Sequence, residues 1–218
     1  MGMAKKAEAA SRSTDHRFAP DSMDRARSRS PPAQERSGLP PVAQWVFQKT
    51  SQEGKTMAIS YDGKPIEFTV EAASPFELSS FAVDSIRKSL TLRLPPHWGE
   101  RFECLEACLL DVVQRESPRF LGSAFTFEQV SEAYKPVTKK TGDYPRNLRV
   151  KVNTLGLQAT RYWDAAKNRV KAPEQHAGLI FSARVTLRSL WFANDTWGLV
   201  AECTDLKVVE EAAAECPF

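Results

Sequence analysis

The sequence has few cysteines and histidines and no long apolar run. Four cysteines and three histidines occur in 218 residues, and no two cysteines form a C-x-x-C pair, which argues against a structural zinc site. Cys104 and Cys108 lie four residues apart in a helical pattern, so we expect them to be buried, reduced thiols on one face. No apolar run approaches the ~20 residues of a transmembrane helix, and the start MGMAKKAEAASRS lacks the apolar core of a secretory signal. We therefore expect an intracellular protein that makes no membrane contact.

Motifs of catalysis are also missing. The sequence contains no G-x-x-x-x-G-K loop, no H-E-x-x-H and no G-x-S-x-G. Glu103, Glu106 and Asp111 share a predicted helix, but carboxylates on one helix are more often a solvated face than a metal pair. We therefore expect a protein that is not an enzyme and that uses no cofactor or metal.

The first 41 residues contain little that could form a core. They are rich in Ser, Arg, Ala and Pro and have few aliphatic residues, which predicts a disordered tail over residues 1–41. Within it, the tract RARSRSPP (Arg25–Pro32) is compatible with a nuclear address, a phosphorylation site, a nucleic-acid-binding arm or a solvated spacer.

The net charge of +3 conceals an uneven distribution. Twelve Lys or Arg residues lie between positions 135 and 188, against three acidic residues. From Asp195 to the end there are six acidic residues and only Lys207. A basic block followed by an acidic end indicates an anionic partner for the block.

Short alternating segments dominate the rest of the chain. The turn Tyr61–Lys64 predicts a hairpin between two of them, and Pro95-Pro96 and Ser117-Pro118 bound a long helix over residues 99–117. A shorter helix is predicted over 125–134 and a loop over 135–143. The predicted strands are 43–49, 55–61, 65–71, 87–94, 146–152, 158–163, 178–194 and 197–210. This pattern predicts one mainly β domain over residues 42–209, a small closed or nearly closed barrel with inserted helices.

Cations alternate with core residues in two of these strands. Leu148, Val150 and Val152 would face the core while Arg149 and Lys151 project outward, and Arg184 and Arg188 alternate in the same way on the strand 178–194. If the two strands are neighbours, their cations form a stripe suited to a phosphate backbone. The alternative is a solvent-exposed face that carries Lys and Arg for solubility alone.

Aromatic residues and further cations flank this predicted stripe. Tyr162 and Trp163 point to opposite faces, so one belongs to the core and the other could stack on bases beside Arg161. Trp98 and Tyr134 are further candidates for stacking, whereas Trp191, Phe192 and Trp197 are more typical of core packing. The predicted nucleic-acid-binding residues are Lys135, Lys139, Lys140, Arg146, Arg149, Lys151, Arg161, Tyr162, Arg184 and Arg188.

The order of motifs resembles a known family over Met57–Val209. SYDGKPIEFTVEAASPFELSSF, RKSLTLRL, a helix, YPRNLRVKV, TRYWDAAKN and LRSLWFANDTWGLVAECTDLKVV follow one another as in the single-stranded-DNA-binding proteins of large nucleocytoplasmic DNA viruses, especially the algal-virus type. Those proteins resemble in fold the single-stranded-DNA-binding proteins of short-tailed bacteriophages. The resemblance implies an oligonucleotide/oligosaccharide-binding (OB) fold and a role in DNA replication, recombination or repair, in the nucleus or at a viral replication site. The Arg-Ser-rich tail departs from the family pattern.

The end of the chain suggests a second partner. The segment 210–218, EEAAAECPF, resembles the acidic tips of bacterial and phage single-stranded-DNA-binding proteins, which recruit replication enzymes. Glu210, Glu211, Glu215 and Phe218 are the corresponding partner-binding candidates, and an ordinary frayed terminus is the alternative.

Three rivals to single-stranded DNA binding stay open. The first is an RNA-binding protein on the same barrel, which the Arg-Ser tract favours. The second is a scaffold or virion protein that holds other proteins. The third is an enzyme of nucleic-acid metabolism, which should show metal-dependent turnover.

Overall fold

The computed structural model describes residues 39–50, 56–80 and 85–211, with only the backbone of residues 210 and 211. The predicted disordered tail lies outside these residues except for positions 39–41. Of the predicted C-terminal tip, Glu215 and Phe218 lie outside them. The tip was predicted to begin at residue 210, but β11 (Thr196–Glu211) continues to residue 211.

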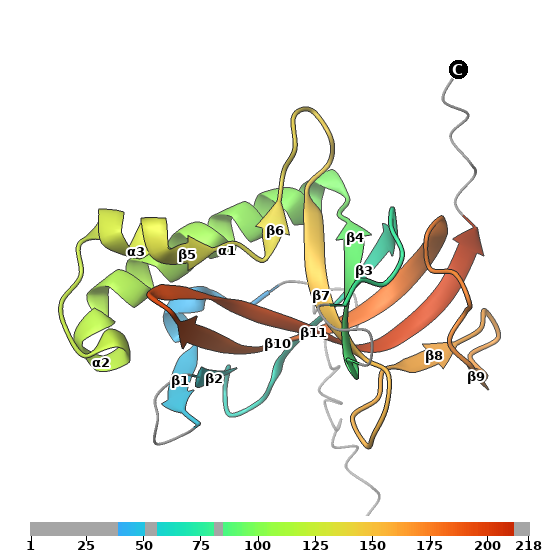
Figure 1. The fold of residues 1–218 in the computed structure, drawn as a ribbon, viewed down its shortest axis with the longest axis horizontal. Coiled ribbons are helices and arrows are strands. Elements are labelled where there is room, and N and C mark those ends of the chain that lie inside the picture. The colour runs from blue at the N-terminus through green and yellow to red at the C-terminus, as the bar shows by residue number, and fades with distance from the viewer. Residues whose placement is uncertain (1–38, 51–55, 81–84, 212–218) are drawn as a thin grey trace, which may run out of the picture. The chain divides into compact units, whose positions relative to one another are not determined.

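Five strands pair in a closed ring (Figure 1). Around the ring, each pair is antiparallel except β7 with β11, and β3 meets β4 only at Ala73 and Arg93. This arrangement confirms the predicted mainly β fold with inserted helices. In order, the ring consists of β10 (Leu179–Ala193), β3 (Ile66–Ala73), β4 (Arg87–Arg93), β7 (Asn147–Asn153) and β11.

The remaining strands extend this ring at its margins. β1 and β2 continue from β10, β8 and β9 continue from β11, β5 pairs with β11, and β6 pairs with β7. Their bounds are β1 (Val46–Lys49), β2 (Thr56–Ser60), β5 (Tyr134–Lys135), β6 (Thr138–Lys139), β8 (Arg161–Trp163) and β9 (Arg169–Val170), and a 3-10 turn, η2 (Val42–Gln44), precedes β1.

The predicted hairpin turn at residues 61–64 is present, closed by an antiparallel bridge between Tyr61 and Lys64, but the strands on either side of it do not pair with each other. Asp62 and Gly63 have φ of +50° and +68°, the left-handed conformation that such a turn requires. However, β2 pairs with β1 and β10, while β3 pairs with β10 and β4. Register shifts along the β10–β11 ladder mark irregularities at which a long strand bends. As a result, β10 pairs with β3 over its first half and with β2 near its end.

The alternation predicted for the inner strands is confirmed. Leu148, Val150 and Val152 on β7 are fully buried, as are Leu90 and Leu92 on β4. Because successive side chains of a strand point to opposite faces, the residues between them lie on the outer face.

Three helices cover one part of the sheet. α1 (Pro96–Arg115) buries Trp98 and Phe102 against Phe68 of β3, with ring centroids 4.8 and 5.5 Å from the Phe68 ring. Burial of each such ring stabilises the fold by roughly 1.5–3 kcal/mol. α2 (Ser117–Leu121) follows at once, with Pro118 in its first turn, so the predicted stop at Ser117-Pro118 is a junction between two helices. α3 (Phe127–Ala133) begins with a capping box.

The prediction for Cys104 and Cys108 was half right. Both line the same shallow pocket beside α1, as their spacing requires, but both are exposed. The helix buries its Phe102, Leu105 and Leu109 face instead, because those larger apolar side chains remove more surface from water. Within the described ranges, no helix has the length and apolar character needed to cross a membrane.

Candidate nucleic-acid interface

A groove on the outer face of β4 and β7 collects three cations, Arg87, Arg149 and Lys151. Lys88 also borders this groove, but alternation along β4 puts its side chain on the inner face with Leu90. In this antiparallel pair Ser89 lies opposite Lys151, and Thr91 lies opposite Arg149. Opposed residues share a face, so both cations project from the side away from the core. We call this surface the β4–β7 groove, and it is lined by Ser79, Ser80, Arg87, Lys88, Ser89, Arg149 and Lys151.

The cations of the β4–β7 groove form no ion pair with a described carboxylate, although Glu202, in register with Lys151, attracts the charge of that lysine. Among the described residues, no carboxylate oxygen lies within 4 Å of the charged nitrogens of Arg87, Lys88, Arg149 or Lys151. Partial burial, together with the charge of Arg87, lowers the pKa of Lys151. A polyanion that binds between these positive charges would reduce their mutual repulsion.

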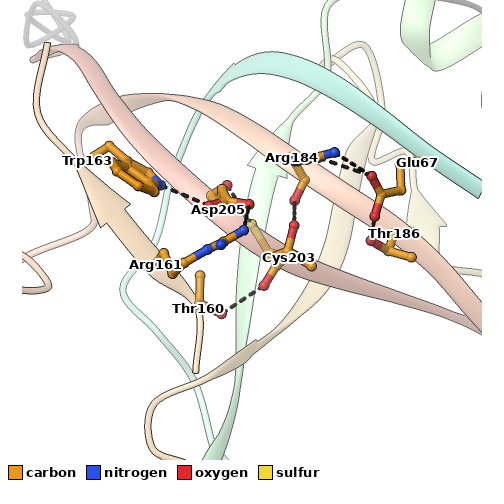
Figure 2. Close-up of polar contacts among 9 residues, drawn as sticks. Glu67, Thr160, Arg161, Trp163, Arg184, Thr186, Cys203 and Asp205 are labelled. Carbon is orange, nitrogen blue, oxygen red and sulfur yellow. Dashed lines mark hydrogen bonds and ion pairs between the residues drawn. The ribbon is translucent and has the colours of Figure 1, made fainter. Parts of the chain in front are cut away.

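The predicted stripe across β7 and β10 is wrong. β11 lies between these strands, and it carries Glu202 and Asp205 on its outer face. Arg188 Nε lies 2.6 Å from Glu202 Oε2 and Arg161 Nη2 lies 2.7 Å from Asp205 Oδ2. Figure 2 shows the Arg161–Asp205 pair and a further pair in which Arg184 Nη2 lies 2.7 Å from Glu67 Oε2. Three of the predicted binding cations are therefore engaged by carboxylates.

Asp205 organises the surface beside β8. It accepts hydrogen bonds from the Arg161 guanidinium and from the Trp163 indole, the latter at 2.9 Å (Figure 2). Burial alone would raise the pKa of Asp205, but these two donors outweigh it and hold the pKa below its ordinary value. Asp205 therefore stays ionised and keeps Arg161 in place at neutral pH.

Tyr162 is a core residue and not a stacking platform. Its side chain is 7% exposed, and its hydroxyl is 3.0 Å from Nε2 of the buried His176. Trp163, the next residue, points to the opposite face of β8 and is partly exposed. A base cannot stack on a ring that is already covered, so Tyr162 is not a candidate for stacking on bases. Trp98, in the first turn of α1, is likewise buried, against Phe68 of β3.

Arg146 supports the fold at the start of β7. Its Nη1 donates to Thr138 Oγ1 at 3.0 Å and lies 3.7 Å from Glu106 Oε2. Burial raises the pKa of Glu106, while hydrogen bonds from Thr138 and Tyr134 oppose that rise. This buried network links the segment that includes β5 and β6 to α1. The side chains of Arg146 and Tyr134 both contact Glu106 within it.

The predicted lysines of the 135–143 segment lie in two places. Lys139 and Lys140 are exposed, and Lys139 pairs with Asn147 in the β6–β7 hairpin, whose loop extends past the end of the sheet (Figure 1). Lys135 lies on β5, which pairs with the Trp197 end of β11. Lys139 and Lys140 therefore belong to the same hairpin as the groove strand β7, and Lys135 does not.

Arg87, the third cation of the groove, was missed in the sequence. The segment RKSLTLRL shows the same alternation as Leu148–Val152 and begins with two cations. That signal was present, but its value depends on β4 lying beside β7, which no local pattern encodes. The described residues contain no cluster of three His, Cys, Asp or Glu side chains able to hold a metal ion.

A second surface pocket, in which two of three arginines are paired with carboxylates, lies across β11 from the β4–β7 groove. We call it the arginine pocket. Three of its lining residues are Arg161, Arg169 and Arg188, and the full lining is Gly156, Leu157, Gln158, Ala159, Arg161, Arg169, Arg188, Glu202, Cys203 and Thr204. Asn153 connects the two surfaces, because its amide donates to Glu202 Oε1 and to the Gln158 carbonyl.

Comparison with known proteins gives matches in structure only. No protein-family model matches the chain, and no curated protein matches it in sequence. The single-stranded DNA-binding protein from bacteriophage Enc34 is 11% identical with a TM-score of 0.44, and the match covers 80% of this chain and 95% of that one. The structure of the same phage protein in complex with ssDNA is 8% identical with a TM-score of 0.44, and the match covers 78% of this chain and 97% of that one.

A second phage protein shows similarity of the same order. It is gp2.5, a single-stranded DNA-binding protein encoded by bacteriophage T7, and it is 13% identical with a TM-score of 0.43. That match covers 69% of this chain and 95% of the phage chain. The solved structures named here are phage proteins, and the resemblance to the algal-virus type stays a prediction. The function of this chain has to be argued from its own groove.

Proposed function

We propose that this protein binds single-stranded DNA without sequence preference, with the phosphate backbone lying along the β4–β7 groove. The observation that carries the proposal is the set of three outward-facing cations, Arg87, Arg149 and Lys151, on two adjacent strands, with no described carboxylate in ion-pair contact. Release of counterions from a bound phosphate chain would supply most of the affinity. The binding would be indifferent to sequence because phosphates are the same at every nucleotide.

The preference for DNA, and a role in replication, recombination or repair, rest on the order of motifs between Met57 and Val209. That order resembles viral proteins that coat exposed DNA strands, as described above. The same resemblance supports recruitment of replication enzymes by the C-terminal tip, and activity in the nucleus or at a viral replication site. We propose the preference for DNA, the role in replication, recombination or repair, the partner enzymes and the location together.

The direct test is fluorescence anisotropy with labelled oligomers of dT, oligomers of U and duplex DNA of equal length. We expect the tightest binding to dT, with an affinity that falls as salt is raised. The variant Arg149→Glu with Lys151→Glu should lose most of this binding. A matched control, Lys49→Glu with Lys64→Glu, changes the net charge equally at two exposed positions outside the groove and should bind almost normally.

Several results would contradict the proposal. Equal losses in the two double variants would mean that net charge matters and the groove does not. Tighter binding to U than to dT would favour the RNA-binding rival. Absence of binding to all three ligands would leave the groove a solvated face and favour the scaffold rival.

A further inference from the structure

Three large aliphatic side chains are exposed beside the β4–β7 groove. Leu157 is 108% exposed, Leu155 is 68% exposed and Ile86 is 53% exposed. Ile86 directly precedes Arg87 of the groove, and both leucines belong to the loop between β7 and β8. We call these three residues the aliphatic rim. Exposed apolar side chains that gather beside a charged surface mark a binding site more often than isolated ones do.

Hydrogen bonds hold this loop in a defined conformation. The backbone N–H and the hydroxyl of Thr154 both donate to the Ile86 carbonyl, at 2.9 and 3.0 Å. Gly156 has φ of +90°, a conformation that favours glycine, and its carbonyl accepts from the Ala159 N–H at 3.1 Å. The leucines are therefore presented to solvent by a structured turn that is attached to the start of β4.

The aliphatic rim lies between the β4–β7 groove and the arginine pocket. On one side, Ile86 adjoins Arg87 of the β4–β7 groove. On the other, Leu157 itself lines the arginine pocket together with Arg161, Arg169 and Arg188. A ligand that leaves the groove in this direction passes from cations without ion-pair partners to apolar side chains. In the arginine pocket beyond them, Asp205 and Glu202 already pair with Arg161 and Arg188.

Unpaired nucleic acid has this alternation of chemistry. Its phosphates are anionic and its bases have free apolar faces, whereas in a duplex those faces are stacked inside. Leu and Ile are among the side chains that insert between bases in other nucleic-acid complexes.

We propose that the aliphatic rim contacts the bases of a single strand whose phosphates occupy the β4–β7 groove beside it. This inference rests on the proposed function and adds to it the residues that distinguish unpaired from paired DNA. The groove supplies the salt-dependent part of the affinity. The rim supplies a salt-independent part that only exposed bases can use.

The test compares a short dT oligomer with an abasic oligomer that has the same number of phosphates. The variant Leu155→Ser with Leu157→Ser should bind dT about tenfold more weakly than the wild type, and should bind the abasic oligomer as the wild type does. The slope of log K against log[salt] should not change, because no phosphate contact is lost. The control Val46→Ser with Phe127→Ser removes exposed apolar side chains elsewhere and should leave dT binding unchanged.

The outcomes separate the rim from the groove. If the wild type binds both oligomers with salt dependence but the rim variant binds dT normally, the rim proposal is overturned and the groove proposal stands. Equal weakening on dT and abasic oligomers would also overturn it, since bases would not be the contacted group. If light scattering shows that the rim variant changes the mass of the free protein while dT affinity is kept, the rim is a protein–protein contact. If the wild type binds neither oligomer, both proposals fail.

Discussion

The salt dependence of binding is the quantity that the β4–β7 groove predicts most directly. Arg87, Arg149 and Lys151 all lie on or at the end of the outer face of β4 and β7, and the triple change to Gln removes three charges without adding bulk. For single strands the slope of log K against log[salt] is about −0.7 for each neutralised phosphate, so the slope should become less negative by about 2.1. Between about 50 and 200 mM salt, the wild type should lose about 18-fold more affinity than the variant.

The assay is anisotropy with labelled oligo-dT at four or five salt concentrations, for both proteins and one control. The control changes Lys49, Lys64 and Lys135 to Gln, which removes the same charge from positions outside the groove. Thermal unfolding must show that both variants remain folded. Parallel lines for wild type and groove variant would refute the reasoning, even with weaker binding, because the lost affinity would then not come from phosphate contacts.

Three further predictions concern Glu202, Glu106 and His176. Glu202→Gln frees Arg188 at the junction of the β4–β7 groove and the arginine pocket, so dT titrations should show tighter binding and a slope steeper by about 0.7. Glu106→Ala leaves buried donors without a partner and should lower the free energy of unfolding in urea by about 3 kcal/mol, whereas the exposed Glu103→Ala should cost under about 0.5 kcal/mol. Burial lowers the pKa of His176, so the unfolded chain binds a proton below pH 6.5 that the folded protein does not. Stability should therefore fall as pH drops through 6.5, and urea unfolding of His176→Gln should lack that fall.

Local features of this protein follow from its sequence. The burial of Leu148, Val150 and Val152 could be predicted because the pleat of a strand sends alternate side chains to opposite faces, whatever the neighbours are. The turn at Asp62-Gly63 and the course of α1 were predictable for the same reason, since they depend on backbone conformation and on spacing along a few residues. Arg149 and Lys151 were identified as outward-facing by this reasoning.

Only the tertiary structure decided which strands became neighbours. Strand partners are chosen by long-range contacts, so periodicity could not show that β7 pairs with β4 and β11 rather than with β10. That choice brought Arg87 into the groove, and it set Glu202 and Asp205 against cations that looked free in the sequence.

The same reason explains the aromatic pair at the end of the segment. Alternation requires Tyr162 and Trp163 to face opposite ways, but the placement of β8 beside β11 determines which one is buried. The sequence by itself therefore determined the face on which each side chain of a strand lies relative to its neighbours. Which face became core, and which cations were left without a carboxylate, depended on contacts between residues far apart in the chain.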